Sequence, residues 1–294
     1  MTRSIATREV GRQTREYLEL IKISHTVFAL PFAIGTTFLA AGGWPRLDVL
    51  GKVVLAVVLA RAASMAFNRW ADQRFDAANP RTAERALPAG RLNPKFVLGS
   101  SLIALAAFFA VAAWINPLAL RLSPFVALVL FGYSFTKRFT SLCHAILGLA
   151  LGLAPVGAWV AVRGSLAGEP LTLGLAVLFW TAGFDVIYAC LDVEFDRQAG
   201  LFSLPARIGV AGALRLAAGF HAAMLGVLAG LWWQSDDLGA VFLTAMGLVA
   251  ALLVYEHRLV RADDLTRVNQ AFFTTNGVIS AVLMIALITD AFVD

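Results

Sequence analysis

Residues 96–120 read FVLGSSLIALAAFFAVAAWINPLAL, a run of twenty-five residues without a charged side chain. As a helix, such a run is long enough to cross the ~30 Å hydrocarbon layer of a membrane, which needs about 20 apolar residues. Similar charge-free runs recur at 23–45, 139–162, 216–235 and 268–289. Because helices satisfy all their backbone polar groups inside lipid, the sequence predicts an all-α, polytopic membrane protein.

The composition agrees with this class. Of 294 residues, 59% are hydrophobic and 15% are charged, whereas soluble domains have about 45–50% apolar and about 25% charged residues. The net charge of +5 is small, and we expect no nucleic-acid partner. Cys143 and Cys190 lie far apart, without histidines at ligand spacing. They predict neither a disulfide framework nor a zinc or iron–sulfur site.

The apolar windows predict about nine transmembrane helices in one domain, residues 1–294, with the helices bundled around a central cavity. The expected spans are 23–43, 47–68, 96–114, 118–136, 141–162, 171–191, 213–233, 238–255 and 270–290.

The distribution of basic residues predicts the orientation. Residues 1–22 carry five Lys or Arg residues and are predicted to form a basic segment on the membrane surface. Of the 24 Lys and Arg residues, 19 fall in this segment and in the loops on the same side, and four on the other side. By the positive-inside rule, we expect the N-terminus to be cytoplasmic and the C-terminus to be outside. A bacterial inner membrane is the expected location.

The second and sixth predicted spans end in the same acidic pattern. Asp72 and Asp76 end one span, Asp192 and Asp196 end the other, and the two pairs are 120 residues apart. A single Asp-x-x-x-Asp pair is weak evidence, because a solvated helix end has the same pattern. Two pairs at the cytoplasmic ends of spans that run in the same direction instead predict one shared site, and suggest an internal duplication.

Polar residues precede each acidic pair by one turn. Asn68 stands four residues before Asp72, and Tyr188 four residues before Asp192, so each shares a helix face with its aspartate. Carboxylates gathered at a membrane boundary repel one another and need cations. Oxygen ligands without histidine or thiolate favour Mg²⁺, which bridges carboxylates to substrate phosphates. Two Mg²⁺ ions would balance the carboxylates and still attract a diphosphate.

Basic residues in the flanking cytoplasmic loops are candidates for binding that diphosphate. Arg81 and Arg85 follow the first acidic pair, and Lys137 and Arg138 stand in the next inner loop. Arginine forks suit phosphate oxygens. The alternative interpretation is that these residues only determine topology.

Arg61 falls in the middle of a predicted span, where an arginine is costly without a partner. We expect either a role in the cavity or a structural ion pair, with Asp185 as its possible partner. The four histidines, in contrast, share no spacing. His25, His144, His221 and His257 are expected to be structural or interfacial.

These patterns resemble the UbiA superfamily of intramembrane aromatic prenyltransferases. Its signatures, Asn-x-x-x-Asp-x-x-x-Asp and Asp-x-x-x-Asp, match Asn68, Asp72 and Asp76, and then Asp192 and Asp196. Residues 79–90 resemble the first cytoplasmic loop of the family, and 133–138 resemble its Tyr-x-x-x-Lys-Arg element. The resemblance covers nearly the whole chain. Family members often have Asn-Asp where this chain has Asn68-Arg69, so that second ligand position is lost.

Within the superfamily, residues 183–205 resemble the 4-hydroxybenzoate polyprenyltransferase branch, including bacterial members of the futalosine route to menaquinone. The resemblance implies Mg²⁺-dependent transfer of a polyprenyl group from its diphosphate to an aromatic acceptor. The implied acceptor is 4-hydroxybenzoate or a related phenolic acid, in ubiquinone or menaquinone biosynthesis. Haem O synthases, chlorophyll synthases and naphthoate prenyltransferases share the aspartate signatures and remain alternatives.

The resemblance also implies roles for individual residues. The implied metal ligands, for two Mg²⁺ ions, are Asn68, Asp72, Asp76, Asp192 and Asp196. The implied substrate-binding residues are Arg61, Asn68, Arg81, Arg85, Tyr133, Lys137 and Arg138, of which Arg138 is the candidate partner for a benzoate carboxylate. The implied catalytic residues are Asp185, Tyr188 and Lys137, with Asp185 or Tyr188 orienting the acceptor or assisting removal of its ring proton. We expect the lipid bilayer to surround the enzyme, and no obligate protein partner.

Two other functional classes fit the sequence less well. A transporter with inverted repeats would place its acidic residues near the midplane, on spans of opposite direction. A CDP-alcohol phosphotransferase would need an Asp-Gly…Ala-Arg run before Gly-x-x-x-Asp-x-x-x-Asp, and position 68 is Asn without such a lead.

Overall fold

The computed structural model describes residues 13–22 and 28–293, and their regular structure is helical apart from one isolated bridge between Arg261 and Asp264. The long helices of the bundle are α2 (Leu30–Ala41), α3 (Leu47–Ala71), α5 (Pro94–Ile115), α6 (Pro117–Thr136), α7 (Cys143–Arg163), α8 (Gly168–Ala189), α10 (Leu204–Gln234), α11 (Ala240–Leu259) and α12 (Asn276–Val293). The short elements are α4 (Gln73–Ala78), η2 (Cys190–Asp192), α9 (Val193–Gln198) and the π-helical turn η3 (Gln270–Thr275).

Within the described residues, eight helices are long and apolar enough to cross a membrane, the last of them counted with its π-helical turn. The remaining long element, α2, is an apolar helix of 12 residues. These elements match the nine predicted spans and confirm the all-α membrane fold. Residues 23–27 of the first predicted span lie outside the described residues, as do residues 1–12 of the predicted basic segment.

Capping residues explain where several helices begin and end. The side chains of Asn93, Asn116 and Ser203 each accept a hydrogen bond from a backbone N–H in the first turn of α5, α6 and α10, and a proline follows each cap within two residues. Gly42 and Gly164 end α2 and α7 with φ values of 61° and 68°, where a side chain would be strained.

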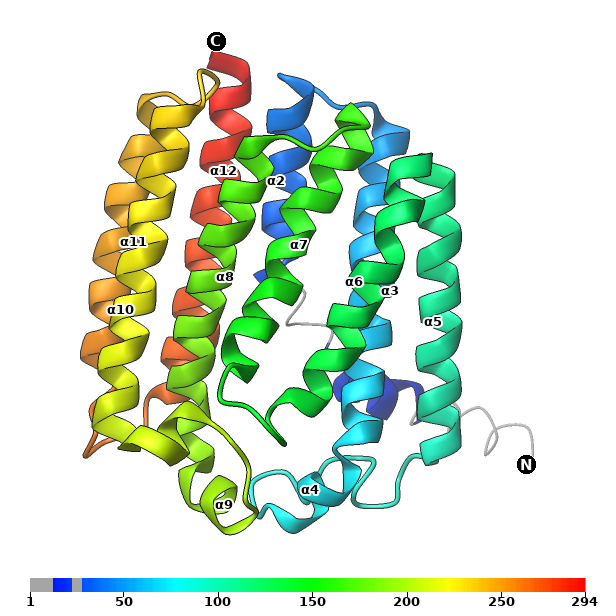
Figure 1. The fold of residues 1–294 in the computed structure, drawn as a ribbon, viewed down its shortest axis with the longest axis vertical. Helices are drawn as coiled ribbons and strands as arrows, with labels where there is room; N and C mark the ends of the chain where they lie inside the picture. Colours follow the sequence, from blue (N-terminus) through cyan, green and yellow to red (C-terminus); the bar gives the residue numbers. More distant parts are fainter. Residues whose placement is uncertain (1–12, 23–27, 294) are drawn as a thin grey trace, which may run out of the picture.

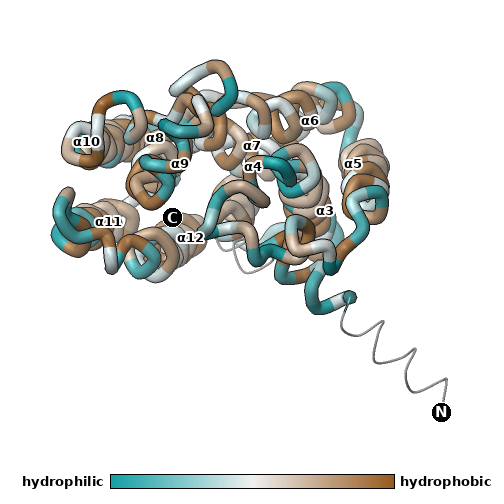
Figure 2. The backbone as a smooth tube through the Cα atoms, turned by 90° about the horizontal axis from the view of Figure 1, so that it is seen from below, coloured by the Kyte–Doolittle hydropathy of each residue, from teal (hydrophilic) through white to brown (hydrophobic). Residues whose placement is uncertain are grey.

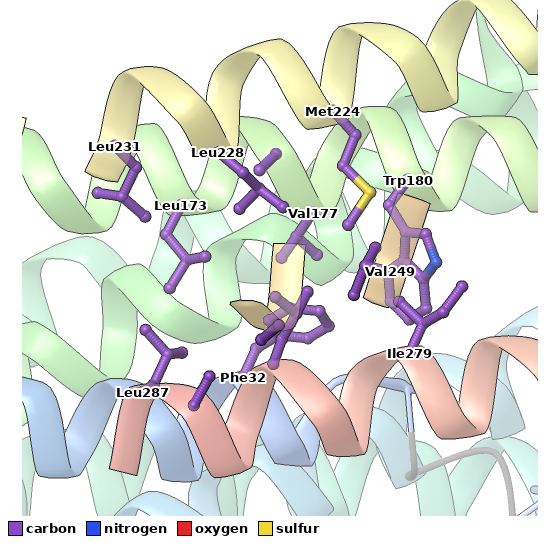
Figure 3. Close-up of a cluster of buried hydrophobic side chains, with 14 of the residues drawn as sticks. Phe32, Leu173, Val177, Trp180, Met224, Leu228, Leu231, Val249, Ile279 and Leu287 are labelled. Atoms are coloured by element: carbon purple, nitrogen blue, oxygen red, sulfur yellow. The ribbon is translucent and has the colours of Figure 1, made fainter. Parts of the chain in front are cut away.

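The main hydrophobic core joins α2, α8, α10, α11 and α12. Figure 3 shows side chains from these helices pointing toward one another around Trp180 and Phe32. Trp180 is fully buried, and its indole N–H donates to Asn276 Oδ1 at 2.6 Å. The core therefore forms on one side of the bundle and includes α8, the helix that leads into the second acidic motif.

Helices α7 and α8 pack closely through glycines. A Cβ atom placed on Gly148 would lie 2.4 Å from the carbonyl oxygen of Leu178, and one on Gly152 would lie 2.4 Å from that of Gly174. Small residues allow helix backbones to approach closely in membranes. This contact fixes the position of α7 relative to the N-terminal half of α8.

Both acidic motifs lie at one end of the bundle, which we call the polar end. Figure 1 shows α4 and α9, which follow α3 and α8, together at this end, whereas the C-terminal end of α12 lies at the other. The helical turns at 13–20 also lie at the polar end (Figure 1). Seen from that end, hydrophilic residues gather in α4, α9 and the neighbouring loops (Figure 2). The two motifs are therefore arranged in parallel, as predicted.

At the opposite end, Asp290 is buried and caps α11. Its Oδ2 accepts hydrogen bonds of 2.9 Å from the backbone N–H groups of Gly239 and Phe242. We expect Asp290→Ala to reduce the free energy of unfolding by about 1–3 kcal/mol, because two buried N–H groups lose a charged partner. A lower midpoint of thermal unfolding in detergent would be the measurement. Asp236→Ala, an exposed position at this end, is the control, and equal midpoints for both variants would contradict the role as a cap.

Candidate functional site

A cavity of about 610 Å³ lies at the polar end, and all four motif aspartates line it. Of the thirteen site residues predicted from the sequence, twelve line this cavity. The exception is Arg138, which reaches its wall indirectly through Asp72. The two acidic motifs, which are 120 residues apart in the sequence, thus contribute to one polar cavity.

The two motifs share a local backbone geometry. The helix breaks at the first aspartate of each motif: Asp72 has φ −92° and ψ 6°, and Asp192 has φ −108° and ψ 7°. A short helix then begins, and the second aspartates, Asp76 and Asp196, are each 7% exposed. This repeated break supports the internal duplication.

In the first motif, Asp72 contacts three donors. Its carboxylate accepts hydrogen bonds of 3.1 Å from Asn68 Nδ2 and from Arg138, and Lys137 Nζ lies 3.6 Å away. Arg138 also donates to the carbonyl oxygen of Ala71 at 2.8 Å. Arg138 is therefore already occupied in holding the end of α3.

Asp76 pairs with the loop that follows it. Arg85 donates to its Oδ1 at 2.7 Å, and Arg69 lies 3.7 Å from Oδ2. Among the described residues, Oδ2 is buried without a hydrogen-bond partner. Such an atom is costly to bury unless a ligand completes its contacts.

Arg81 joins the first loop to the second motif. Its guanidinium donates to both carboxylate oxygens of Asp192, with 2.8 Å between Nε and Oδ1, and to the hydroxyl of Tyr188 at 2.9 Å. Asn79 Nδ2 also donates to Asp192 at 2.8 Å. The sequence did not predict this contact of Asn79, because its partner is more than one hundred residues away.

The basic residues of the cavity wall repel one another. Burial and the neighbouring charge of Arg69 lower the pKa of the Arg85 guanidinium. Burial, together with the charges of Arg69 and Arg85, likewise lowers the pKa of the Lys22 ammonium group. Because burial and neighbouring cations disfavour the charged forms of Arg85 and Lys22, this part of the cavity is suited to an anion.

Asp185 lies deeper in the cavity wall and pairs with His144. The distance between His144 Nδ1 and Asp185 Oδ2 is 2.7 Å, so Asp185 does not serve as the ion-pair partner of Arg61 that the sequence suggested. From the sequence, His144 was expected to be structural or interfacial, because no fixed spacing links it to Asp185 and only the packing of α7 on α8 brings them together. His221 and His257 contact each other elsewhere, at 2.9 Å.

Arg61 and Tyr133 lie where the polar cavity meets a second, apolar cavity. This second cavity measures about 160 Å³ and lies among α3, α5, α6 and α7, with both residues in its wall. The Nε atom of Arg61 is buried without a hydrogen-bond partner among the described residues. A mid-span cation next to an apolar cavity indicates an anionic ligand group.

The donor set fits a hard cation. The polar cavity presents carboxylate and amide oxygens, which are ligands of Mg²⁺, and Asp76 Oδ2 lacks a hydrogen-bond partner in the described part of the chain. No group of three His, Cys, Asp or Glu side chains within the described residues is close enough to hold a metal by itself. Mg²⁺ commonly uses one or two carboxylates and completes its shell with water and substrate phosphates.

Comparisons with known proteins agree with this geometry. A model of the UbiA prenyltransferase family matches residues 28–278. The 4-hydroxybenzoate octaprenyltransferase of Aeromonas hydrophila is 31% identical over 280 residues, which are 94% of this chain and 95% of that protein. The enzyme of the same name from Vibrio atlanticus is 32% identical over 288 residues, covering 95% and 99% of the two chains.

Solved structures have the same fold. A UbiA homolog from Aeropyrum pernix matches 91% of this chain and 98% of its own length, with a TM-score of 0.82 and 34% identity. A UbiA homolog from Archaeoglobus fulgidus, bound to GPP and Mg²⁺, matches 93% and 99% with a TM-score of 0.73 and 23% identity.

Proposed function

We propose that this chain, which belongs to the UbiA prenyltransferase family, transfers a polyprenyl group from its diphosphate to the ring of a phenolic acid. The proposed acceptor is 4-hydroxybenzoate or a related phenolic acid, in ubiquinone or menaquinone biosynthesis. One observation carries the proposal: a cavity lined by two acidic motifs and several basic side chains adjoins an apolar cavity, and Arg61 lines both. The names of the relatives support the choice of acceptor.

Mg²⁺ is the proposed cofactor, as two ions held by Asn68 and the four motif aspartates. When bound, the metal stabilises the negative charge that develops on the departing diphosphate. The relative bound to GPP and Mg²⁺ supports this choice.

The chain's own cations would bind the diphosphate oxygens. Arg81, Arg85 and Lys137 each face a motif carboxylate, so they already lie where a metal-bound diphosphate would sit. Binding then exchanges carboxylate partners for phosphate oxygens, which arginine forks match well. The charge gathered on the leaving group favours breaking the bond between the allylic carbon and oxygen.

Arg61 would bind the carboxylate of the acceptor. Arg138, the first candidate for this role, is occupied by Asp72 and Ala71 and lies outside the lining of the cavity. Arg61 faces both cavities, and Asp185 in the wall of the same polar cavity would accept the ring proton. Tyr188 is held by Arg81 and packs on Phe272, with ring centroids 4.3 Å apart, so it would shape the site around the allylic carbon.

The prenyl tail explains why the site is in a membrane. Each buried CH₂ group contributes about 0.8 kcal/mol, and the apolar cavity and the surrounding lipid would receive the chain. We also propose that the polar end faces the cytoplasm, in a bacterial inner membrane, with no obligate protein partner.

The proposed function is tested with purified protein in liposomes, Mg²⁺, a set of prenyl diphosphates and a panel of acceptors. The panel contains 4-hydroxybenzoate, a dihydroxynaphthoate and haem, with products identified by mass. We expect the 4-hydroxybenzoate product to dominate and to disappear in EDTA. Prenylation of the naphthoate or haem alone would assign the chain to another branch of the family, and absence of any product would contradict the proposal.

Arg61→Leu tests the acceptor site. We expect the KM for 4-hydroxybenzoate to rise about 10- to 100-fold, because a charge-assisted hydrogen bond is lost. The affinity for prenyl diphosphate should stay the same. The methyl ester of the acceptor has no carboxylate, so its KM should be insensitive to the substitution, and an equal rise for acid and ester would contradict the assignment.

A further inference from the structure

We propose that His144 is a positioning residue, which holds one oxygen of Asp185 so that the other faces the acceptor ring in the cavity. The inference rests on the proposed function, because it assigns Asp185 the ring proton. His144 acts only through Asp185 and does not itself take up the proton.

The contact between the two side chains is short and largely enclosed. His144 Nδ1 lies 2.7 Å from Asp185 Oδ2, and the side chains are 4% and 24% exposed. Both residues line the polar cavity. Asp185 is therefore the more exposed member of the pair, and the His144 side chain is almost fully enclosed.

The second ring nitrogen of His144 determines where the ring proton lies. The backbone N–H of Leu204 points to His144 Nε2 at 3.3 Å. A backbone amide nitrogen only donates, so Nε2 must present a lone pair, which places the proton of the neutral ring on Nδ1. His144 thus donates to Asp185, and this donation is favoured while Asp185 is ionised.

Three segments hold His144 in place. It stands in the first turn of α7, and the glycine contacts at Gly148 and Gly152 bring α7 against α8, which carries Asp185. Leu204 begins α10, directly after its cap Ser203, which also lines the cavity. The loop after the second acidic motif is thereby linked, through His144, to the carboxylate that faces the acceptor.

The chemical step is balanced. The bond between the allylic carbon and the diphosphate oxygen breaks, and the diphosphate leaves with the electron pair. The ring carbon beside the phenol carbon forms the new bond to the allylic carbon. The proton on that ring carbon then passes to Asp185, and its loss restores the aromaticity of the ring. Asp185 later returns the proton to water. His144 keeps its own proton throughout.

His144→Leu and His144→Asn form the first test. We expect His144→Leu to lower kcat about 10- to 100-fold, the usual effect of losing an orienting partner, while the KM for prenyl diphosphate stays unchanged. His144→Asn should recover most of the activity, because its amide N–H replaces the donor at Nδ1. Equal losses in both variants, or a loss confined to KM, would overturn the proposal.

A double-mutant cycle with Asp185→Asn is the second test. Asp185→Asn alone should lower kcat about 10²- to 10⁴-fold, as expected for loss of a general base. In that background, His144→Leu should have no further effect, because its partner can no longer act. A full additional loss would mean that His144 acts independently of Asp185.

Histidine ¹⁵N NMR gives a readout that does not depend on turnover. The chain has four histidines, and the spectrum of His144→Asn in nanodiscs assigns the missing signal. We expect a neutral ring with its proton on Nδ1, which changes in Asp185→Asn. A proton on Nε2, or a doubly protonated ring, would overturn the geometry. If the wild-type protein makes no prenylated product, the proposed function fails, and this spectrum still decides whether His144 donates to Asp185.

Discussion

Replacing Asp72 or Asp192 with asparagine is expected to reduce kcat for prenyl transfer about 10³-fold, near the upper end of the effect of removing one group that stabilises transition-state charge. The substitution keeps the size of the side chain but removes a metal ligand. It also leaves Arg138 or Arg81 facing a neutral amide, although each now pairs with a carboxylate. The measurement is product formation together with Mg²⁺-dependent binding of prenyl diphosphate, and both should decline.

Glu194→Gln is the matched control for these variants. Glu194 lies between the two aspartates of the second motif, but its side chain is 81% exposed. It therefore loses the same charge from the same segment without reaching the cavity, and we expect activity close to that of the wild type. If Asp72→Asn and Asp192→Asn were as active as Glu194→Gln at saturating Mg²⁺, the metal site would be wrong.

Arg81→Lys should be nearly as damaging, with kcat lowered about 10²- to 10³-fold. Arg81 uses three nitrogens at once, donating to both oxygens of Asp192 and to Tyr188. Lysine keeps the charge but presents it at one point, so it cannot reproduce the fork on a carboxylate or a phosphate. Steady-state kinetics with saturating acceptor give the measurement.

Arg91→Lys in the same loop is the control for Arg81→Lys. The Arg91 side chain is 44% exposed and lies 3.5 Å from Glu16, away from the cavity lining. We expect this conservative change to leave kcat unaltered. Similar kinetics for the two variants would show that the fork of Arg81 has no special role.

The membrane fold follows from sequence because the thickness of the hydrocarbon layer determines helix length. The charge-free run at 96–120 accordingly corresponds to α5 and the start of α6. The helix breaks at Asp72 and Asp192 were not predicted, since nothing in the apolar pattern marks them. The same holds for the kink in α10, where Gly209 has φ 73°.

The acidic part of the site could be predicted because it repeats at helical spacing. Asp72 and Asp76 recur as Asp192 and Asp196 at the ends of two predicted spans, so local sequence alone indicated a shared site. No such pattern marks His144, because its partner Asp185 is 41 residues away and meets it only through the close contact of α7 with α8. Residues that meet only through tertiary packing have no regular spacing in the sequence, so a single sequence does not predict their contact.

Ring-deuterated 4-hydroxybenzoate shows whether the enzyme forms a carbon–carbon bond to the ring of the acceptor. Prenylation beside the phenol replaces one of the four ring deuterons, so we expect a Mg²⁺-dependent product that keeps three of them. A prenylated product that keeps all four would mean transfer to oxygen and would rule out the proposed ring prenylation.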